Sequence, residues 1–291
     1  MNSFFGADIH LEQLGALWLI ILLSAGVICF LVSEFTGNYS QVDKLWSLLP
    51  VIYSLVTINY FTSTRLWIMC LLVIIWGFRL SYNFYRKGGY NIIPWKGEED
   101  YRWKILRQHP ILKGRIRFGL FNLFFISFYQ NFIILLFSSP LLMAAKYNNF
   151  PLTWIDIAAA SLMLLFIITE TAADNQQYTF HRLKRQMDVT EGFFTRSLKN
   201  GFLSEGLWQY VRHPNFVSEQ AIWISFYLFG AAASGHWINW TLSGSFLLVL
   251  LFVGSSEMTE RISSSKYPGY AEYKKEVPRF IPRIFRSGKS G

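Results

Sequence analysis

Residues 13–33 read QLGALWLIILLSAGVICFLVS, a run of 21 residues without Asp, Glu, Lys or Arg. A helix of about 20 apolar residues crosses the roughly 30 Å of hydrocarbon in a bilayer. In a soluble protein, a helix of that length would present a charged face to water. The run therefore predicts a membrane-spanning helix.

Similar runs recur along the chain, and together they predict about seven transmembrane helices. The expected spans are residues 13–33, 45–64, 66–85, 118–145, 154–177 and two within 220–256, joined by a turn at 234–237. Only 15% of the residues are charged, against about 25% in soluble proteins. We expect an all-α, polytopic membrane helical bundle. The sequence shows no repeat and no linker, so residues 1–291 are expected to form a single membrane domain.

The positive charge is unevenly distributed and predicts an orientation. Twenty-three of the 27 Lys and Arg residues lie in the segments 86–117, 182–212 and 261–289. With seven spans these segments share one face, which the positive-inside rule makes cytoplasmic. The C-terminus is then cytoplasmic, in a bacterial inner membrane or the endoplasmic reticulum. Topology and anionic membrane lipid account for the net charge of +9 without a nucleic-acid partner.

Cysteine and histidine give no sign of a metal or a disulfide framework. Cys29 and Cys70 both fall inside expected spans, and the five histidines are scattered singly. Asp8 and Glu12 precede the first span where a secretory signal would carry basic residues, so that span is expected to stay in the protein.

The fifth span carries an unusual polar stripe. Glu170, Asp174, Gln177 and His181 recur at spacings of four, three and four residues and so share one helical face. Ionisable groups inside a membrane are costly and usually functional. The alternative is that the helix simply emerges into water and carries a solvated polar face.

A second polar group precedes the sixth span. Pro214 suits the first turn of a helix, whose free amides, with Arg212 and His213, would form a corner that attracts anions. Glu219 lies one turn after Asn215 at the hydrocarbon edge, and we expect Arg212 or Arg261 to pair with it. An interfacial helix cap with a snorkelling arginine is the alternative.

A third group ends the seventh span. Glu257 and Arg261 are spaced for an intrahelical ion pair. Residues 267–282 predict a turn, a short amphipathic helix and a proline-bounded segment at the interface.

The second and third groups together resemble a superfamily of membrane enzymes. The matching elements are Arg212-His213-Pro214-Asn215-Phe216, then Glu260, Lys266-Tyr267, Tyr273 and residues 277–282. They are similar to elements shared by steroid 5-alpha-reductases, delta-14 sterol reductases and isoprenylcysteine carboxyl methyltransferases. Motifs at residues 41–47, 76–83, 86–90, 98–103 and 170–176 extend the resemblance to membrane proteins with a steroid 5-alpha-reductase-like C-terminal domain. Residues 170–291 would then be the cofactor-binding part.

This resemblance implies NADPH as the cofactor. In 5-alpha-reductases an Asn-Phe-x-Gly-Glu element and an upstream Asp bind NADPH, which implicates Asn215, Glu219 and Asp174. Ser218 replaces the usual Gly, which puts the close approach of the cofactor in doubt. The other residues expected on the cofactor side are Arg182, Tyr210, Arg212, His213, Glu260, Tyr267 and Lys274.

The activity expected from the resemblance is NADPH-dependent reduction of a hydrophobic enone or sterol-like lipid, an oxidoreductase reaction on a CH–CH bond. The substrate would arrive from the lipid, and Tyr82 beside Asp43 is the expected proton donor. An interfacial aromatic anchor is an equal alternative for Tyr82. For the whole chain, the alternatives are an S-adenosylmethionine-dependent methyltransferase of a lipidated substrate and a non-catalytic lipid-binding or carrier protein. Arg182, Lys184 and Arg185, beside Arg212 and His213, offer more positive charge than S-adenosylmethionine can use, which favours NADPH.

Overall fold

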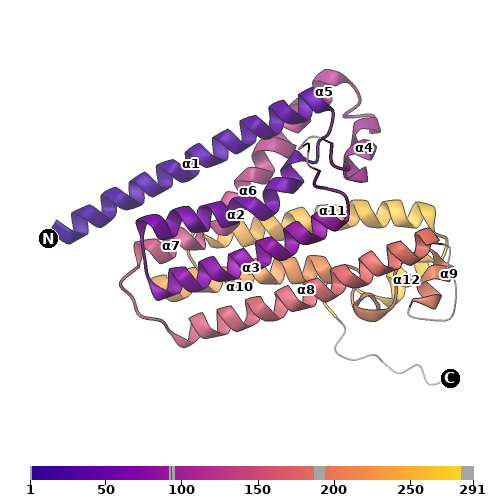
Figure 1. The fold of residues 1–291 in the computed structure, drawn as a ribbon. Helices are drawn as coiled ribbons and strands as arrows, with labels where there is room; N and C mark the ends of the chain where they lie inside the picture. Colours follow the sequence, from indigo (N-terminus) through magenta and orange to yellow (C-terminus); the bar gives the residue numbers. More distant parts are fainter. Residues whose placement is uncertain (1, 92, 94–95, 187–193, 283–291) are drawn as a thin grey trace. The chain divides into compact units, whose positions relative to one another are not determined.

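The computed structural model describes residues 2–91, 93, 96–186 and 194–282, and this part of the chain is built of helices, turns and loops (Figure 1). The expectation of an all-α chain is confirmed. In chain order the helices are α1 (Asn2–Thr36), α2 (Gln41–Tyr60), α3 (Thr64–Arg86), α4 (Tyr101–Gln108), α5 (Arg115–Phe121), the π-helix η1 (Asn122–Tyr129), α6 (Gln130–Ser138), α7 (Pro140–Lys146), α8 (Trp154–Gln186), α9 (Thr195–Asn200), the 3₁₀ helix η2 (Gly206–Gln209), α10 (Pro214–Ser234), α11 (Leu242–Lys266) and α12 (Tyr270–Glu276).

Five helical stretches are long and apolar enough to cross a membrane. They are Ile9–Thr36, Thr64–Arg86, Arg115–Lys146, Trp154–Gln186 and Leu242–Lys266. The chain is therefore a multi-pass integral membrane protein. Helices α2 and α10, of 20 and 21 residues, lie where the other two spans were expected. These two helices are more polar than the five candidate spans, since α2 carries Asp43 and Lys44 in its first turn and α10 carries Glu219. The count of seven spans therefore stays a prediction.

The chain separates into two compact units, which are described one at a time. Unit 1 holds residues 1–161 and 224–247, and unit 2 holds residues 162–223 and 248–291. The expected cofactor-binding part, residues 170–291, thus belongs to unit 2 apart from residues 224–247.

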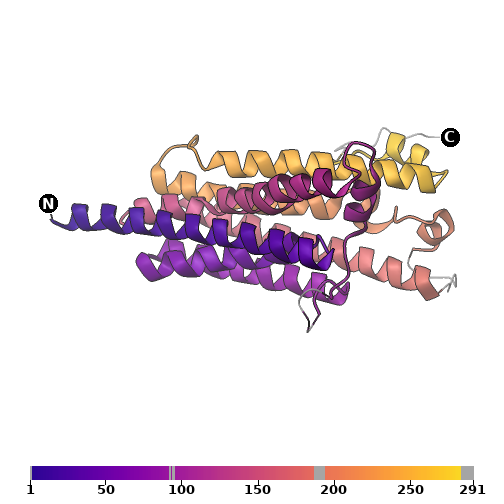
Figure 2. The ribbon, with the colours of Figure 1, turned by 90° about the horizontal axis from the view of Figure 1, so that it is seen from above.

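In unit 1, α1, α2 and α3 run alongside one another (Figure 2). Helices α2 and α3 lie close together at Gly77, where an added Cβ would stand 2.8 Å from the carbonyl oxygen of Ser47. Only glycine fits at that distance, because larger residues would push the two helices apart. Trp18 of α1 packs its ring on that of Tyr53 of α2, with centroids 4.4 Å apart, and both side chains are buried.

One buried ion pair closes the connection between α7 and α8 in unit 1. Arg65 Nε donates to Asp156 Oδ1 at 2.7 Å, and Arg65 Nη2 donates to Asp156 Oδ2 at 3.0 Å. The same guanidinium also donates to the backbone carbonyls of Phe150 and Pro151. Its hydrogen-bonding capacity is thus largely satisfied inside the protein, as burial of an arginine requires.

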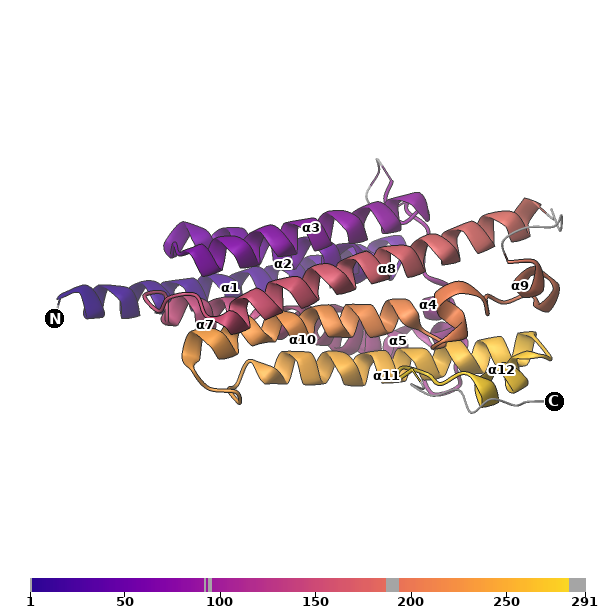
Figure 3. The same ribbon diagram turned by 90° about the horizontal axis from the view of Figure 1, so that it is seen from below.

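In unit 2, the short helix α12 lies beside the end of α11 (Figure 3). Phe202 packs against Tyr267, Tyr270 and Tyr273, and Val277 completes this aromatic cluster. The turn, short helix and proline-bounded segment expected at residues 267–282 are confirmed. The helix is amphipathic as expected, but it buries its apolar face on this aromatic cluster.

Candidate functional site

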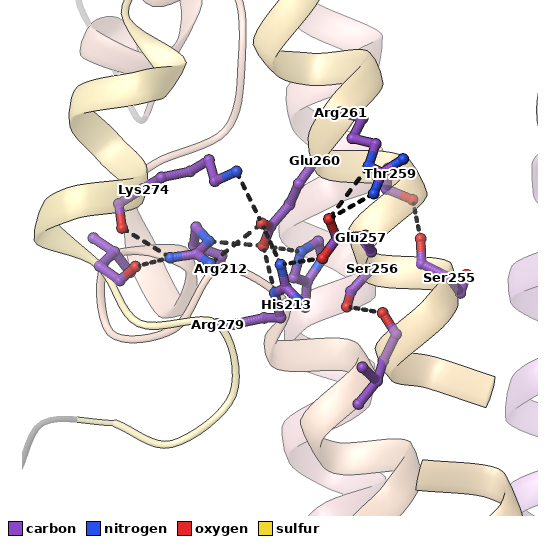
Figure 4. Close-up of polar contacts among 12 residues, drawn as sticks. Arg212, His213, Ser255, Ser256, Glu257, Thr259, Glu260, Arg261, Lys274 and Arg279 are labelled. Atoms are coloured by element: carbon purple, nitrogen blue, oxygen red, sulfur yellow. Dashed lines mark hydrogen bonds and ion pairs between the residues drawn. The ribbon is translucent and has the colours of Figure 1, made fainter. Parts of the chain in front are cut away.

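Glu260, near the end of α11 in unit 2, is the centre of a buried network of charges (Figure 4). Its carboxylate accepts from Arg212 Nε at 2.8 Å and from Arg279 at 3.2 and 3.0 Å, and it lies 3.1 Å from His213 Nε2. Lys274 Nζ stands 3.6 Å from the second carboxylate oxygen. Four basic side chains therefore converge on one buried acid, which satisfies its lone pairs in place of water.

Arg212 uses its remaining hydrogen-bonding capacity on the C-terminal segment. Its Nη1 donates to the carbonyl of Lys274 at 3.0 Å and to the carbonyl of Val277, while its backbone N–H donates to the carbonyl of Pro278 at 2.9 Å. Arg212 thus ties the start of α10 to α11, to α12 and to the segment that follows α12. Arg212 is buried, so it does not match the alternative of a snorkelling interfacial arginine. We call the network of Arg212, His213, Glu260, Lys274 and Arg279 the buried clasp.

The clasp has an exposed extension on α11. Arg279 Nη2 also donates to Glu257 at 3.0 Å, and Glu257 pairs with Arg261 at 3.2 Å (Figure 4). The expected intrahelical pair between Glu257 and Arg261 is confirmed, and its side chains are 47% and 78% exposed. Arg261 is therefore not the partner of Glu219.

His213 lies in an apolar setting despite its contact with Glu260. Its ring stacks on Phe216 with centroids 5.2 Å apart and an interplanar angle of 15°, and Phe280 lies 6.2 Å away. Burial lowers the pKa of His213 below its usual range, although the hydrogen bond with Glu260 opposes this. We therefore treat His213 as neutral, donating Nε2–H to the carboxylate.

The intramembrane acids predicted from the sequence are buried in unit 2. Glu170 and Asp174 on α8 and Glu219 on α10 each expose 5% of their surface or less. Glu219 Oε1 accepts from Trp223 Nε1 at 2.9 Å. Arg212 and Arg261, which could have served as partners of Glu219, pair with Glu260 and Glu257 instead.

Asn215, one turn before Glu219 on α10, carries an unsatisfied acceptor. Its side-chain oxygen Oδ1 is buried and has no hydrogen-bond partner among the described residues. A buried carbonyl oxygen without a partner costs on the order of 1–3 kcal/mol. Such an atom next to a buried carboxylate on the same helix is a natural contact for a polar ligand.

Helix α8 is longer than one crossing of a membrane requires. Its 33 residues span about 50 Å, well beyond the roughly 30 Å of hydrocarbon. If the span begins near Trp154, about 20 residues bring it to Asp174, so Asp174 lies near the membrane edge. Of the predicted stripe, Glu170 and Asp174 are buried, whereas His181 is exposed.

Lys184, at the end of α8, contacts Tyr267. Lys184 Nζ donates to Tyr267 Oη at 2.9 Å and to the carbonyl of Gly201. Burial raises the pKa of the Tyr267 phenol, but the hydrogen bond and charge of Lys184 outweigh it and lower the pKa overall. An added Cβ on Gly201, where φ is +82°, would stand 2.9 Å from the ring of Tyr267.

The other predicted cofactor residues differ in exposure. Tyr210, two residues before Arg212, and Arg182 on α8 are exposed, and Lys274 is half-buried at the edge of the clasp.

Arg279 is a member of the clasp that the sequence reasoning missed. Its place within the Val277–Pro282 segment was the available signal.

The predicted proton donor lies in unit 1. Tyr82 on α3 is 56% exposed, and the guanidinium of Arg86 lies 5.7 Å from its ring centroid. Asp43 accepts from Trp103 Nε1 at 3.1 Å. Within the described part of the chain no hydrogen bond joins Tyr82 to Asp43, and the contact of Tyr82 with Arg86 suits an interfacial aromatic anchor.

Asp43 belongs to a polar junction that accounts for two of the sequence motifs. Asp100 caps α4, accepting from the backbone N–H of Arg102 at 2.9 Å, and the backbone N–H of Asp100 donates to Ser40 Oγ at 2.8 Å. The contact from Trp103 to Asp43 continues this junction to α2. Residues 41–47 and 98–103 therefore meet in unit 1 as a structural joint.

Comparison with known proteins identifies relatives along nearly the whole chain. The uncharacterized protein C594.04c of Schizosaccharomyces pombe is 39% identical over 279 residues, which covers 91% of this chain and 79% of the relative. No solved structure gives a significant match. Residues 29–277 match the model of the family described as "Protein of unknown function (DUF1295)". The matched region takes in Glu260, Arg212, His213 and Lys274, although not Arg279, and the buried acids of α8 and α10, and the chain belongs to the DUF1295 family.

Proposed function

We propose that the chain is an NADPH-dependent reductase that acts on a CH–CH bond of a hydrophobic enone or sterol-like lipid. The observation that carries this proposal is the unsatisfied Oδ1 of Asn215, buried one turn before the buried carboxylate of Glu219 in a membrane-embedded helical protein. A buried acceptor without a partner is expensive, so a ligand that donates to Asn215 Oδ1 accounts for its presence.

The residues of unit 2 fit the polar parts of a nicotinamide dinucleotide. Asn215 Oδ1 is an acceptor suited to an amide N–H or a ribose hydroxyl, and the carboxylates of Asp174 and Glu219 suit ribose hydroxyls. Arg182 and Arg185 are exposed cations for phosphate, and Lys274 is half-buried. Arg212 is left out of this set, because Glu260 and two backbone carbonyls occupy its donors.

When bound, NADPH supplies the hydride for reduction. The roles of the chain are to hold the cofactor at Asp174, Asn215 and Glu219, and to admit an apolar substrate from the membrane. Helix α8 exposes Leu165 and Ile168, five and two residues before Glu170, so the exposed apolar and buried polar positions of this helix lie within a few residues of each other.

The methyltransferase alternative gains weight from the clasp. The charge argument for NADPH counted Arg212, which is engaged, and Lys184, which donates to Tyr267 and Gly201. Fewer cations therefore remain for a pyrophosphate and a 2′-phosphate than the sequence suggests. S-adenosylmethionine has no phosphate and so does not need these cations. Both ligands are therefore tested in the same binding experiment.

The experiment is a binding titration of purified protein in nanodiscs with NADPH, NADH and S-adenosylmethionine. We expect saturable NADPH binding that weakens about tenfold or more in Asp174→Asn and Glu219→Gln, since hydrogen bonds to charged groups contribute roughly 1.5–3 kcal/mol. Glu257→Gln is the matched control, because its carboxylate is exposed and lies outside the proposed contacts. Saturable S-adenosylmethionine binding without NADPH binding would overturn the reductase proposal.

A further inference from the structure

Unit 1 contains an apolar groove that includes none of the residues of the proposed cofactor site. The groove has a volume of about 240 Å³ and is lined by Leu11 and Gly15 of α1, Leu142, Met143 and Lys146 of α7, and Trp240. Its size is below the roughly 300–1,000 Å³ of pockets that enclose a whole small-molecule ligand. It is suited to one flexible apolar chain.

The ends of three spans place this groove at a membrane surface. Leu11 is near the start of the span Ile9–Thr36, Lys146 is the last residue of Arg115–Lys146, and Trp240 lies two residues before Leu242–Lys266. Three independent helices therefore put the rim at the level of lipid headgroups. The indole of Trp240 is 54% exposed there, as is typical of aromatic residues at the interface.

The charged residue at the rim of the groove indicates which lipid headgroup would bind there. Lys146 is exposed, with its Nζ 5.7 Å from the ring centroid of Tyr147. Arg65, the other basic residue of the loops on this side, is buried in its pair with Asp156. A single exposed ammonium beside an apolar groove at headgroup level matches the single phosphate of a phospholipid.

We propose that this groove binds one phospholipid, with an acyl chain along Gly15 and Met143 and its phosphate on Lys146. Glu12 is exposed next to Leu11 and disfavours additional negative charge on the headgroup. Phosphatidylethanolamine therefore binds at least as well as phosphatidylglycerol. The proposal does not depend on the activity of unit 2.

Gly15 allows a sharp test, because no atom lies within 4 Å of a Cβ built on it. Gly15→Phe adds a ring at the groove on a Cβ that meets no other atom, whereas Gly15→Ala, its matched control, adds only that Cβ and leaves the groove open. Both changes suit a helix better than glycine does, so neither threatens folding through helix propensity. Lys146→Gln removes the charge and keeps most of the side-chain length.

The experiment uses native mass spectrometry of delipidated full-length protein with added phosphatidylethanolamine, phosphatidylglycerol or diacylglycerol. We expect one tightly held phospholipid in the wild type and in Gly15→Ala, and loss of that lipid in Gly15→Phe. Lys146→Gln should bind either phospholipid about fivefold more weakly and diacylglycerol unchanged. Unchanged phospholipid binding in Gly15→Phe, or equal binding of diacylglycerol and phospholipid by the wild type, refutes the proposal.

Discussion

Replacing Glu260 with Gln tests whether the buried clasp holds the C-terminal segment in place. The side chain of Glu260 is 1% exposed and pairs with the buried Arg212 and with Arg279. Glutamine keeps the shape and one acceptor but removes the only buried negative charge of the clasp among the described residues. Removing one partner of a buried ion pair costs about 3–5 kcal/mol, because the other charge is left uncompensated. We take about 3 kcal/mol, since glutamine retains some hydrogen bonding.

Hydrogen exchange measured by mass spectrometry reads this cost directly. The amide of Arg212 donates to the carbonyl of Pro278, and the amide of Val277 donates to the carbonyl of Tyr273. If the segment opens locally, about 3 kcal/mol raises the opening constant roughly a hundredfold and exchange accelerates by the same factor. Peptides from α2, which lies in unit 1, provide the internal reference.

Glu257→Gln is the matched control, one turn earlier on α11. Glu257 also pairs with Arg279, but its side chain is 47% exposed, and exposed ion pairs contribute little. We expect exchange in α12 to change by less than a few-fold. If Glu260→Gln and Glu257→Gln have the same effect, or if neither changes exchange, the clasp does not hold this segment.

Three further predictions address the fold. Asp156→Asn should destabilise unit 1 by about 3 kcal/mol, because Arg65 is left buried without a counter-charge; an unchanged thermal unfolding curve contradicts this. Because the pKa of His213 is below its unfolded value of 6.5, mainly through burial, stability should be full above that pH and fall as pH drops through the folded pKa. His213→Gln should flatten this dependence in a pH series of unfolding temperatures. In the seven-span orientation, cysteines at the exposed positions Lys199 and Asn149 should react with an impermeant reagent from opposite sides of the membrane; labelling from the same side excludes it.

The fold was largely predictable because hydropathy is a local property summed over some 20 residues. The uncharged run at 118–145 lies within the helical stretch Arg115–Lys146, and the turn expected at 234–237 separates α10 from α11. The proline-rich tail also revealed its short helix. The two ambiguous spans are α2 and α10, in which polar motif residues share a helix with apolar ones. Each helix is long enough to cross a membrane, but its composition is more polar than that of the five candidate spans.

The partners of the charged residues were not predictable in the same way. From the sequence, Glu219 stood seven positions from Arg212 and was the expected partner. The structure pairs Arg212 with Glu260, 48 positions away, and gives Glu219 the indole of Trp223. The partner of a charged side chain depends on which helix ends meet in the fold and on which backbone carbonyls need hydrogen-bond donors. No spacing rule within one helix contains that information, and Arg279 was missed for the same reason.

The clasp also changes how the Arg-His-Pro-Asn element should be interpreted. Within five consecutive residues, Arg212 and His213 hold the C-terminal segment, whereas Asn215 presents an unsatisfied acceptor. Loss of activity in an Arg212 variant is therefore no evidence that Arg212 contacts a phosphate, because such a variant also releases α12. A direct contact is distinguished by loss of ligand binding with hydrogen exchange in α12 unchanged. Under the proposed function, Asn215 is the residue of this element that we expect to bind the ligand, and we expect Arg212 and His213 to position the helix that carries it.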